Sequence, residues 1–345
     1  MISGVAVKRK SRKRRSWPFL VAIISLFAFA TVTYAAYLIT RPLNIPVDQV
    51  YVFESGANAT DLANMLHENG HLTNPELLVW VARTGQFERS LKAGEYQFQP
   101  DLNLLQVLSK IVEGKSIDHQ IQFIEGWTFK EFLVELSKKA NLKQTLAEAD
   151  TDAVLESLGI LEQHPEGWFF PDTYNFNTGQ TDLSILQRSH DRMKEILEQE
   201  WENRSPDLPY ETAYECLIAA SIIQKESSVD EEFPIIAGVI VNRLNKGMRL
   251  QMDPTVIYGL GGIDGPLKRS ELDRDTPYNT YTRSGFPPTP IAMPGLAAIQ
   301  AAARPAETSY LYFVSRGDGT HQFSNTIDEH LKAVRNYRSI VEKQG

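Results

Sequence analysis

A glutamate stands near the end of an otherwise apolar stretch in SIIQKESS, Ser221–Ser228. Counting back from Glu226, Ile223 and Ile222 lie three and four residues earlier and Ala219 lies seven earlier, so the helical repeat places this carboxyl group on the apolar face. A glutamate kept from water holds its proton above the reference pKa of about 4.3. Such an acid can protonate a leaving oxygen, as in the cleavage of a glycosidic bond.

An ordinary structural role is the alternative. Glu226 could end its helix in an ion pair with a basic residue such as Arg243 or Arg249. Structural ion pairs are commoner than catalytic carboxylates, so the position of this one residue leaves both interpretations open.

Other groups of reactive residues are weaker candidates. HENGH, His67–His71, matches the zinc-binding pattern H-E-x-x-H, but Gly70 is expected to end the helix, so its two histidines would not share a face. Ser221 lies four residues before Lys225, which is not the S-x-x-K spacing of a serine nucleophile. The one cysteine, Cys216, excludes an internal disulfide and a cysteine-based metal cluster. We therefore expect no metal ion and no cofactor.

The charge distribution indicates a membrane protein with an acidic exterior. Residues 1–16 hold seven of the 35 Lys and Arg residues and no acidic residue, which leaves 28 basic and 43 acidic residues and a net charge of −15 for the rest. Such a body is not expected to bind nucleic acid. The uncharged stretch Trp17–Ile39 has 23 residues, and about 20 suffice to span a bilayer as a helix.

The basic residues before this stretch place 1–16 in the cytoplasm as a basic tail and the rest of the chain outside. A cleaved signal peptide is the alternative, and Ala28-Phe29-Ala30 even offers a cleavage pattern. The apolar run continues past that pattern, however, and exceeds the usual length of a signal peptide's apolar region, so we favour a retained transmembrane helix over 17–39.

Two regions of α+β class are predicted outside the membrane. The first, 47–115, reads as strand, helix, helix, strand and helix, with strands near Tyr51–Phe53 and Gly94–Phe98. The second, 120–345, begins with a middle segment to about Glu202 that is expected to be mostly helical. Within it, the aromatic residues of EGWFFPDTY, Glu166–Tyr174, predict either a core plug or a wall that faces sugar rings.

The last part of the chain is expected to contain the site. A helix from about Tyr210 carries Glu226, and a second helix runs from about Pro234 to Gly247. The stretch Met248–Gly295 is rich in glycine, proline and tyrosine and reads as a long functional loop. A hairpin around RGDG and a closing helix from about Ile327 follow.

Several long motifs resemble the endolytic murein transglycosylase family (the YceG-like proteins). They are IIQKESS, VIVNRLNKGMRLQMDPTVIYGLG, TPYNTYTRSGFPPTPIAMPG, AAARPAETSYLYFV and HQFS, together with EGWFFPDTY and the single N-terminal membrane helix. The resemblance covers nearly the whole exterior part of the chain. It also implies that 47–115 is a LysM-like module and that 120–345 is the transglycosylase catalytic region.

The resemblance implies cleavage within nascent peptidoglycan glycan strands, between N-acetylmuramic acid and N-acetylglucosamine, which limits strand elongation. Glu226 would be the catalytic acid and then base, the C6 hydroxyl of muramic acid would attack C1, and a 1,6-anhydro end would result. Six residues fall in the family's polar cleft and are expected to position substrate: Gln251, Asp253, Tyr258, Tyr278, Asn279 and Tyr281. The enzyme would lie in the inner membrane, with its catalytic domain in the periplasm and peptidoglycan synthases as possible partners.

Two alternatives remain at this point. If Asp253 lay across the scissile bond from Glu226 and activated water, the protein would be a muramidase, because hydrolases of this kind use two carboxyl groups. If neither residue were catalytic, the exterior part would be a wall-binding scaffold without enzymatic activity.

Overall fold

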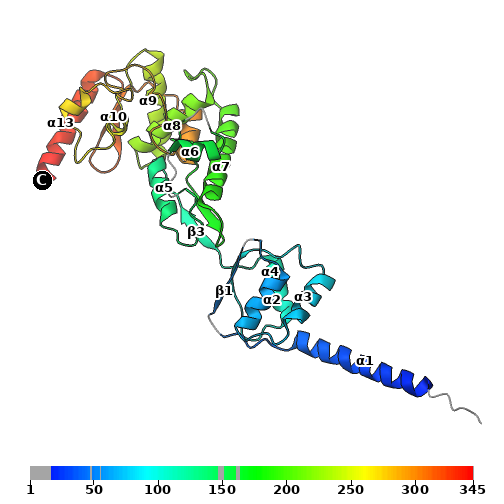
Figure 1. Cartoon of the computed structure of the whole chain (residues 1–345). Helices are drawn as coiled ribbons and strands as arrows, with labels where there is room; N and C mark the ends of the chain where they lie inside the picture. The colour runs from blue at the N-terminus through cyan, green and yellow to red at the C-terminus, as the bar shows by residue number, and fades with distance from the viewer. Residues whose placement is uncertain (1–16, 47–48, 55, 147–150, 161–163, 345) are drawn as a thin grey trace, which may run out of the picture. The chain divides into compact units, whose positions relative to one another are not determined.

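The computed structural model describes residues 17–46, 49–54, 56–146, 151–160 and 164–344. The chain divides into two compact units, Met1–Ile117 and Asp118–Gly345 (Figure 1). Helices combine with three two-stranded antiparallel sheets in these residues, which confirms the α+β class. The predicted basic tail, 1–16, lies outside the described residues.

The first unit begins with the long apolar helix α1, Trp17–Thr40. Within the described residues, the segment Phe19–Thr40 is the one helix long and apolar enough to cross a membrane, with a mean hydropathy of 2.2 over its most apolar window. Its apolar side chains are exposed, as a bilayer requires. A signal sequence near an N-terminus would have the same properties.

The rest of this unit follows the predicted element order. It contains β1 (Val50–Phe53), α2 (Ala59–Glu68), α3 (Pro75–Thr84), β2 (Gly94–Gln97) and α4 (Leu104–Glu113). The two strands pair antiparallel, and capping boxes start α2 and α4. The helices and strands enclose one apolar core. The βααβ order fits the expected module, whereas its LysM-like character stays a prediction.

The HENGH motif does not continue along one helix. The helix α2 ends at Glu68, and Gly70 has a left-handed φ of 77°. The His67 Nδ1 atom lies 2.7 Å from the Leu72 carbonyl oxygen, and the His71 Nε2 atom lies 2.7 Å from the Tyr51 hydroxyl. The two imidazole rings therefore make separate local contacts, as the glycine predicted.

The second unit opens with a small sheet that the sequence did not reveal. The strand β3 (His119–Gln122) pairs with β4 (Thr173–Phe176), so the prediction of a mostly helical middle segment missed both strands. Between them lie α5 (Phe129–Ser137) and α6 (Thr151–Ser157). These strands pack with α5 in their own apolar cluster.

The aromatic loop before β4 is mainly core. Phe169, Phe170 and Tyr174 are buried, and the Tyr174 hydroxyl donates to the Phe170 carbonyl oxygen at 2.8 Å. Trp168 is partly buried and stacks on Tyr214, with ring centroids 5.7 Å apart. The interpretation as a sugar-facing aromatic wall is wrong for the three buried side chains, whereas for Trp168 it stays a prediction.

Four helices form the core behind the site. They are α7 (Asp182–Glu202), α8 (Ala213–Glu226), α9 (Phe233–Asn245) and α12 (Leu296–Ala303), and most of their buried apolar side chains form one cluster. The predicted long loop contains two short helices, α10 (Asp253–Gly259) and α11 (Arg269–Leu272). The hairpin of β5 (Tyr312–Ser315) and β6 (His321–Ser324) and the closing helix α13 (Ile327–Gln344) complete the unit, as predicted.

Candidate active site

Glu226 is the last residue of α8. The helix begins at a capping box, in which the Thr212 hydroxyl accepts from the Glu215 amide and the Glu215 carboxylate accepts from the Thr212 amide. The turns Cys216–Ile223 are buried without interruption, and Ser227 then adopts an extended conformation. The buried run that fixes α8 in the core therefore holds Glu226 at the edge of that core.

The Glu226 side chain is half-buried, with one oxygen completely dry. Its Oε1 atom has no hydrogen-bond partner among the described residues. Burial, and then the negative charge of Asp253, raise the pKa of Glu226 to about 8, while Arg243 opposes the shift. Glu226 therefore holds a proton at neutral pH, as a general acid must.

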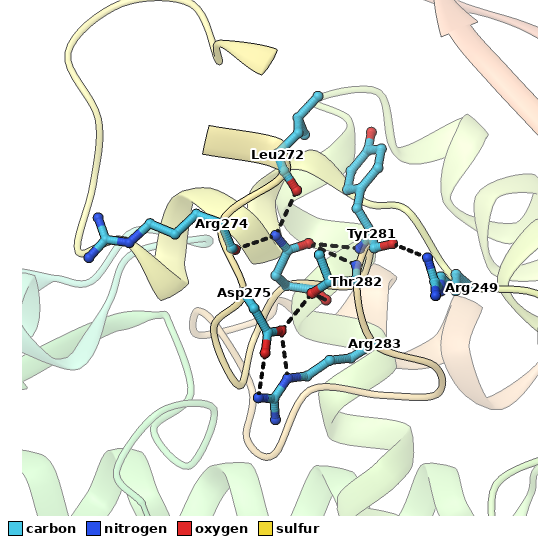
Figure 2. Close-up of polar contacts among 8 residues, drawn as sticks. Arg249, Leu272, Arg274, Asp275, Tyr281, Thr282 and Arg283 are labelled. Atoms are coloured by element: carbon cyan, nitrogen blue, oxygen red, sulfur yellow. Dashed lines mark hydrogen bonds and ion pairs between the residues drawn. The ribbon is translucent and has the colours of Figure 1, made fainter. Parts of the chain in front are cut away.

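The alternative ion pair is not formed in the described part of the chain, since neither Arg243 nor Arg249 bonds to Glu226. The Arg243 guanidinium donates to oxygen atoms of Leu311 (2.6 Å), Leu250 (2.8 Å) and Gln251 (3.2 Å). Arg249 donates to the Tyr281 carbonyl oxygen at 2.8 Å (Figure 2). Both guanidinium groups are therefore hydrogen-bonded to other oxygen atoms, and neither forms an ion pair with the Glu226 carboxyl group in the described residues.

Asp253 and Tyr281 form the second polar pair of the site. Asp253 is the first residue of α10, and its Oδ1 atom accepts a hydrogen bond from the Tyr281 hydroxyl at 2.5 Å. Burial, followed by this carboxylate, raises the pKa of Tyr281. The contact ties α10 to the loop around Tyr281, and the carboxylate of Asp253 lies close enough to Glu226 to raise its pKa.

Asn279 supports that loop from inside. Its side chain is fully buried, and its amide group donates to the carbonyl oxygens of Leu272 (2.9 Å) and Arg274 (2.7 Å). Its Oδ1 atom accepts from the amides of Tyr281 and Thr282. Figure 2 shows these backbone groups arranged around the turn. The geometry favours an indirect part for Asn279, which shapes the loop, and direct contact with substrate stays a prediction.

Gln251 lies two residues before α10 and has a strained backbone conformation. Its φ of 51° falls in the left-handed region, which residues with a side chain seldom adopt. Its backbone amide donates to the Thr280 carbonyl oxygen at 3.2 Å, and its side-chain Oε1 atom accepts from the Arg243 guanidinium. The site therefore fixes the exposed Gln251 side chain through the same arginine that faces Glu226.

Tyr258 and Tyr278 lie in a groove of about 680 Å³ beside these groups. Their rings meet edge to face, with centroids 4.9 Å apart. Lys225, next to Glu226, also lines the groove, as does Pro254 in the first turn of α10. The structure thus brings the predicted residues to two neighbouring places, the polar cluster at the end of α8 and the groove that adjoins it.

The groove contains a carboxyl group that sequence reasoning missed. Glu166 is 5% exposed, and both of its oxygens lie 3.2 Å from the Phe129 amide nitrogen. Burial raises the pKa of Glu166 to about 7, against the hydrogen bonds from Phe129 and from the Tyr258 hydroxyl. Glu166 is the first residue of the EGWFFPDTY stretch, in which only the aromatic residues had been considered as candidates for the site.

Glu232 and His321, which were not predicted from the sequence, hold Ser227, the residue after Glu226. The Ser227 hydroxyl donates to Glu232 Oε2 at 3.1 Å and accepts from the Val229 amide at 3.0 Å. The same carboxylate contacts His321 Nδ1 at 2.6 Å and accepts from the His321 amide at 2.8 Å. Ser227 and Glu232 are both 8% exposed. No sequence spacing links His321 to Glu226, because the two residues lie 95 positions apart.

Comparison with known proteins connects this geometry to a family. The model of the YceG-like family matches residues 51–336. A Bacillus subtilis (strain 168) protein named endolytic murein transglycosylase is 28% identical over 317 residues, which cover 87% of this chain and 85% of that protein. A protein of the same name from Streptococcus pneumoniae serotype 2 (strain D39) is 28% identical over 316 residues, and the match covers 81% of this chain but 56% of the pneumococcal protein.

The fold comparison agrees with the sequence comparison. The crystal structure of a YceG-like protein from Listeria monocytogenes aligns with a TM-score of 0.52 and 28% identity, over 82% of this chain and 98% of that one. The resemblance seen in the sequence motifs is confirmed by these matches. The family model spans most of the length of this chain, so the chain belongs to the YceG-like family.

Proposed function

We propose that the chain is an endolytic lytic transglycosylase that cleaves peptidoglycan glycan strands between N-acetylmuramic acid and N-acetylglucosamine. The observation that carries the proposal is Glu226, a carboxyl group with a dry oxygen and a pKa raised to about 8. The names of the Bacillus and Streptococcus relatives support the choice of substrate. Cleavage within nascent strands would limit their elongation.

Glu226 would act first as acid and then as base. Its proton passes to the glycosidic oxygen while the bond between that oxygen and C1 of muramic acid breaks, and N-acetylglucosamine leaves with a free hydroxyl. The C6 hydroxyl of the same muramic acid attacks C1 and returns its proton to Glu226. A 1,6-anhydro end results, the enzyme is restored, and no water is consumed. One carboxyl group therefore suffices where a glycosidase commonly uses two.

The runner-up is a muramidase in which Asp253 activates water. The Asp253 carboxylate lies close enough to Glu226 to raise its pKa, which is the observation in favour of this alternative. Its Oδ1 atom, however, already accepts the short hydrogen bond from Tyr281. This contact favours Asp253 as a brace between α10 and the loop over Asp253 as a base that must hold a water molecule.

The helix Phe19–Thr40 would anchor the enzyme as a single-pass protein of the cytoplasmic membrane, with its N-terminus inside. The catalytic unit would then work outside the membrane on newly made glycan strands, close to peptidoglycan synthases as partners. A wall-binding scaffold without activity would share this location, so location alone does not test the proposed chemistry.

Mass spectrometry of digested glycan strands tests the proposal. The wild-type protein should release fragments with 1,6-anhydro ends, and Glu226→Gln, which keeps the shape but cannot donate a proton, should be at least about 100-fold slower. A folded Glu226→Gln variant with near-normal activity would reject Glu226 as the acid. A wild-type protein that releases nothing would favour the scaffold.

A further inference from the structure

The groove beside the candidate site is not used by the acid–base steps. It has a volume of about 680 Å³, and Lys225 at the end of α8 and Pro254 in α10 line it. Lys225 directly precedes Glu226 and Pro254 directly follows Asp253, so the groove adjoins the polar cluster. A glycan strand held at Glu226 continues into neighbouring space on each side, so the groove is available to the next part of the strand.

The tyrosine side of the groove fits an N-acetylated sugar ring. The Tyr258 and Tyr278 rings stand at 65° to each other and offer two apolar surfaces. Glu166 lies beside them, hydrogen-bonded to the Tyr258 hydroxyl and without an ion pair among the described residues. A buried carboxyl group of this kind is suited to hydroxyl and acetamido groups, which are neutral donors and acceptors.

Two lysines also line the groove. Lys130 and Lys225 line it, and neither forms an ion pair with the described residues. The Lys225 ammonium donates to the Gly126 carbonyl oxygen at 3.1 Å, which leaves two of its three donors. The Glu131 carboxylate lines the groove as well, and it accepts from the Thr128 amide at 2.7 Å and from the Thr128 hydroxyl at 2.8 Å at the start of α5. Because neither lysine has an ion-pair partner among the described residues, both ammonium groups can contact an anion that enters the groove.

We propose that this groove binds a muramic acid residue together with the carboxylates of its attached peptide stem. The sugar ring lies against Tyr258 and Tyr278, and the stem carboxylates contact Lys130 and Lys225. The inference rests on the proposed function and adds a substrate preference to it: strands with intact, charged stems bind better than strands without that charge.

The test measures binding with the full chain carrying Glu226→Gln, so that the strand is not cleaved. Two probes are compared: uncrosslinked glycan strands with native stems, and the same strands after their stem carboxylates are converted to methylamides. We expect the native strands to bind about five- to tenfold more tightly, the effect of two exposed charge pairs. Adding Lys130→Gln and Lys225→Gln should remove this difference, whereas the matched control Lys194→Gln on α7 should keep it.

The outcomes separate this inference from the proposed function. Equal affinity for the two probes, or a lysine double variant that keeps the full difference, would overturn the stem-binding groove. Single Lys130→Gln, an exposed change on α5 that does not endanger folding, should lose about half of the difference on a logarithmic scale. Release of anhydro ends by the wild type is measured separately, so the groove can fail while the transglycosylase stands.

Discussion

Glu226 keeps its proton because burial outweighs the attraction of Arg243. The sequence placed this carboxyl group on the apolar face of a helix, and the raised pKa of about 8 agrees with that placement. The sequence could not place the charges around it. Asp253 and Arg243 lie 27 and 17 residues further along the chain, and only the fold brings them to the end of α8.

The raised pKa of Glu226 has a consequence for stability. In the unfolded chain the group loses its proton near pH 4.3, as a reference glutamate does, whereas in the folded chain it keeps it to about pH 8. The folded state therefore binds more protons between these values, and its stability falls as pH rises through that window. Glu226→Gln should remove this loss, so the variant should melt above the wild type at pH 8 but close to it at pH 4. Melting curves that differ equally at both pH values would contradict the dry carboxyl group.

Asp253 can be tested through its effect on Glu226. Asp253→Asn removes the negative charge that raises the pKa of Glu226, while the new amide oxygen can still accept from Tyr281. Because the acid must be protonated, activity should fall at a lower pH in the variant than in the wild type. The products should still carry anhydro ends. Loss of all turnover at every pH, in a folded variant, would instead assign Asp253 the role of a base.

The elements show where sequence patterns were sufficient and where they were not. The order of strands and helices in the first unit, and the start of α9 near Pro234, agree with the prediction. The strands β3 and β4 were missed, because each has four residues and finds its partner more than 50 residues away. The short helix α10 was not predicted, because it lies in a proline- and glycine-rich stretch that reads as a loop. Pro254 nevertheless suits a first helical turn.

The contact between the β5–β6 hairpin and the end of α8 should matter for catalysis. His321→Ala removes the imidazole that holds Glu232, which in turn holds Ser227. Loss of a buried hydrogen bond to a charged group costs about 1–3 kcal/mol, so we expect lower stability and a kcat reduced several-fold with little change in KM. The exposed neighbour Gln322→Ala is the matched control. An unchanged kcat in His321→Ala would show that the hairpin only stabilises the fold.

At the scale of the whole molecule, the family and the α+β class could be predicted from the sequence, since long motifs and a 23-residue apolar stretch need no tertiary contact to be seen. The groove could not be predicted. Its lining comes from α5, the Glu166 loop, α8, α10 and the Tyr278 loop, and no linear pattern unites them.

The apolar helix α1 gives a prediction for the intact protein. The segment Phe19–Thr40 is apolar throughout its length, so the full chain should remain in the membrane fraction after high-salt and carbonate washes. Immunodetection of the washed pellet and supernatant would measure this. A soluble mature chain that begins near Thr31 would identify the segment as a cleaved signal sequence.

In the proposed reaction, Glu226 directs an attack by the substrate's own C6 hydroxyl and not by water. Digestion of glycan strands by the wild-type enzyme in ¹⁸O-labelled water, followed by mass spectrometry of the muramic acid ends, tests it most directly. We expect unlabelled ends that are lighter than hydrolysed ends by one water molecule. Reducing ends that carry ¹⁸O would contradict it and establish a hydrolase.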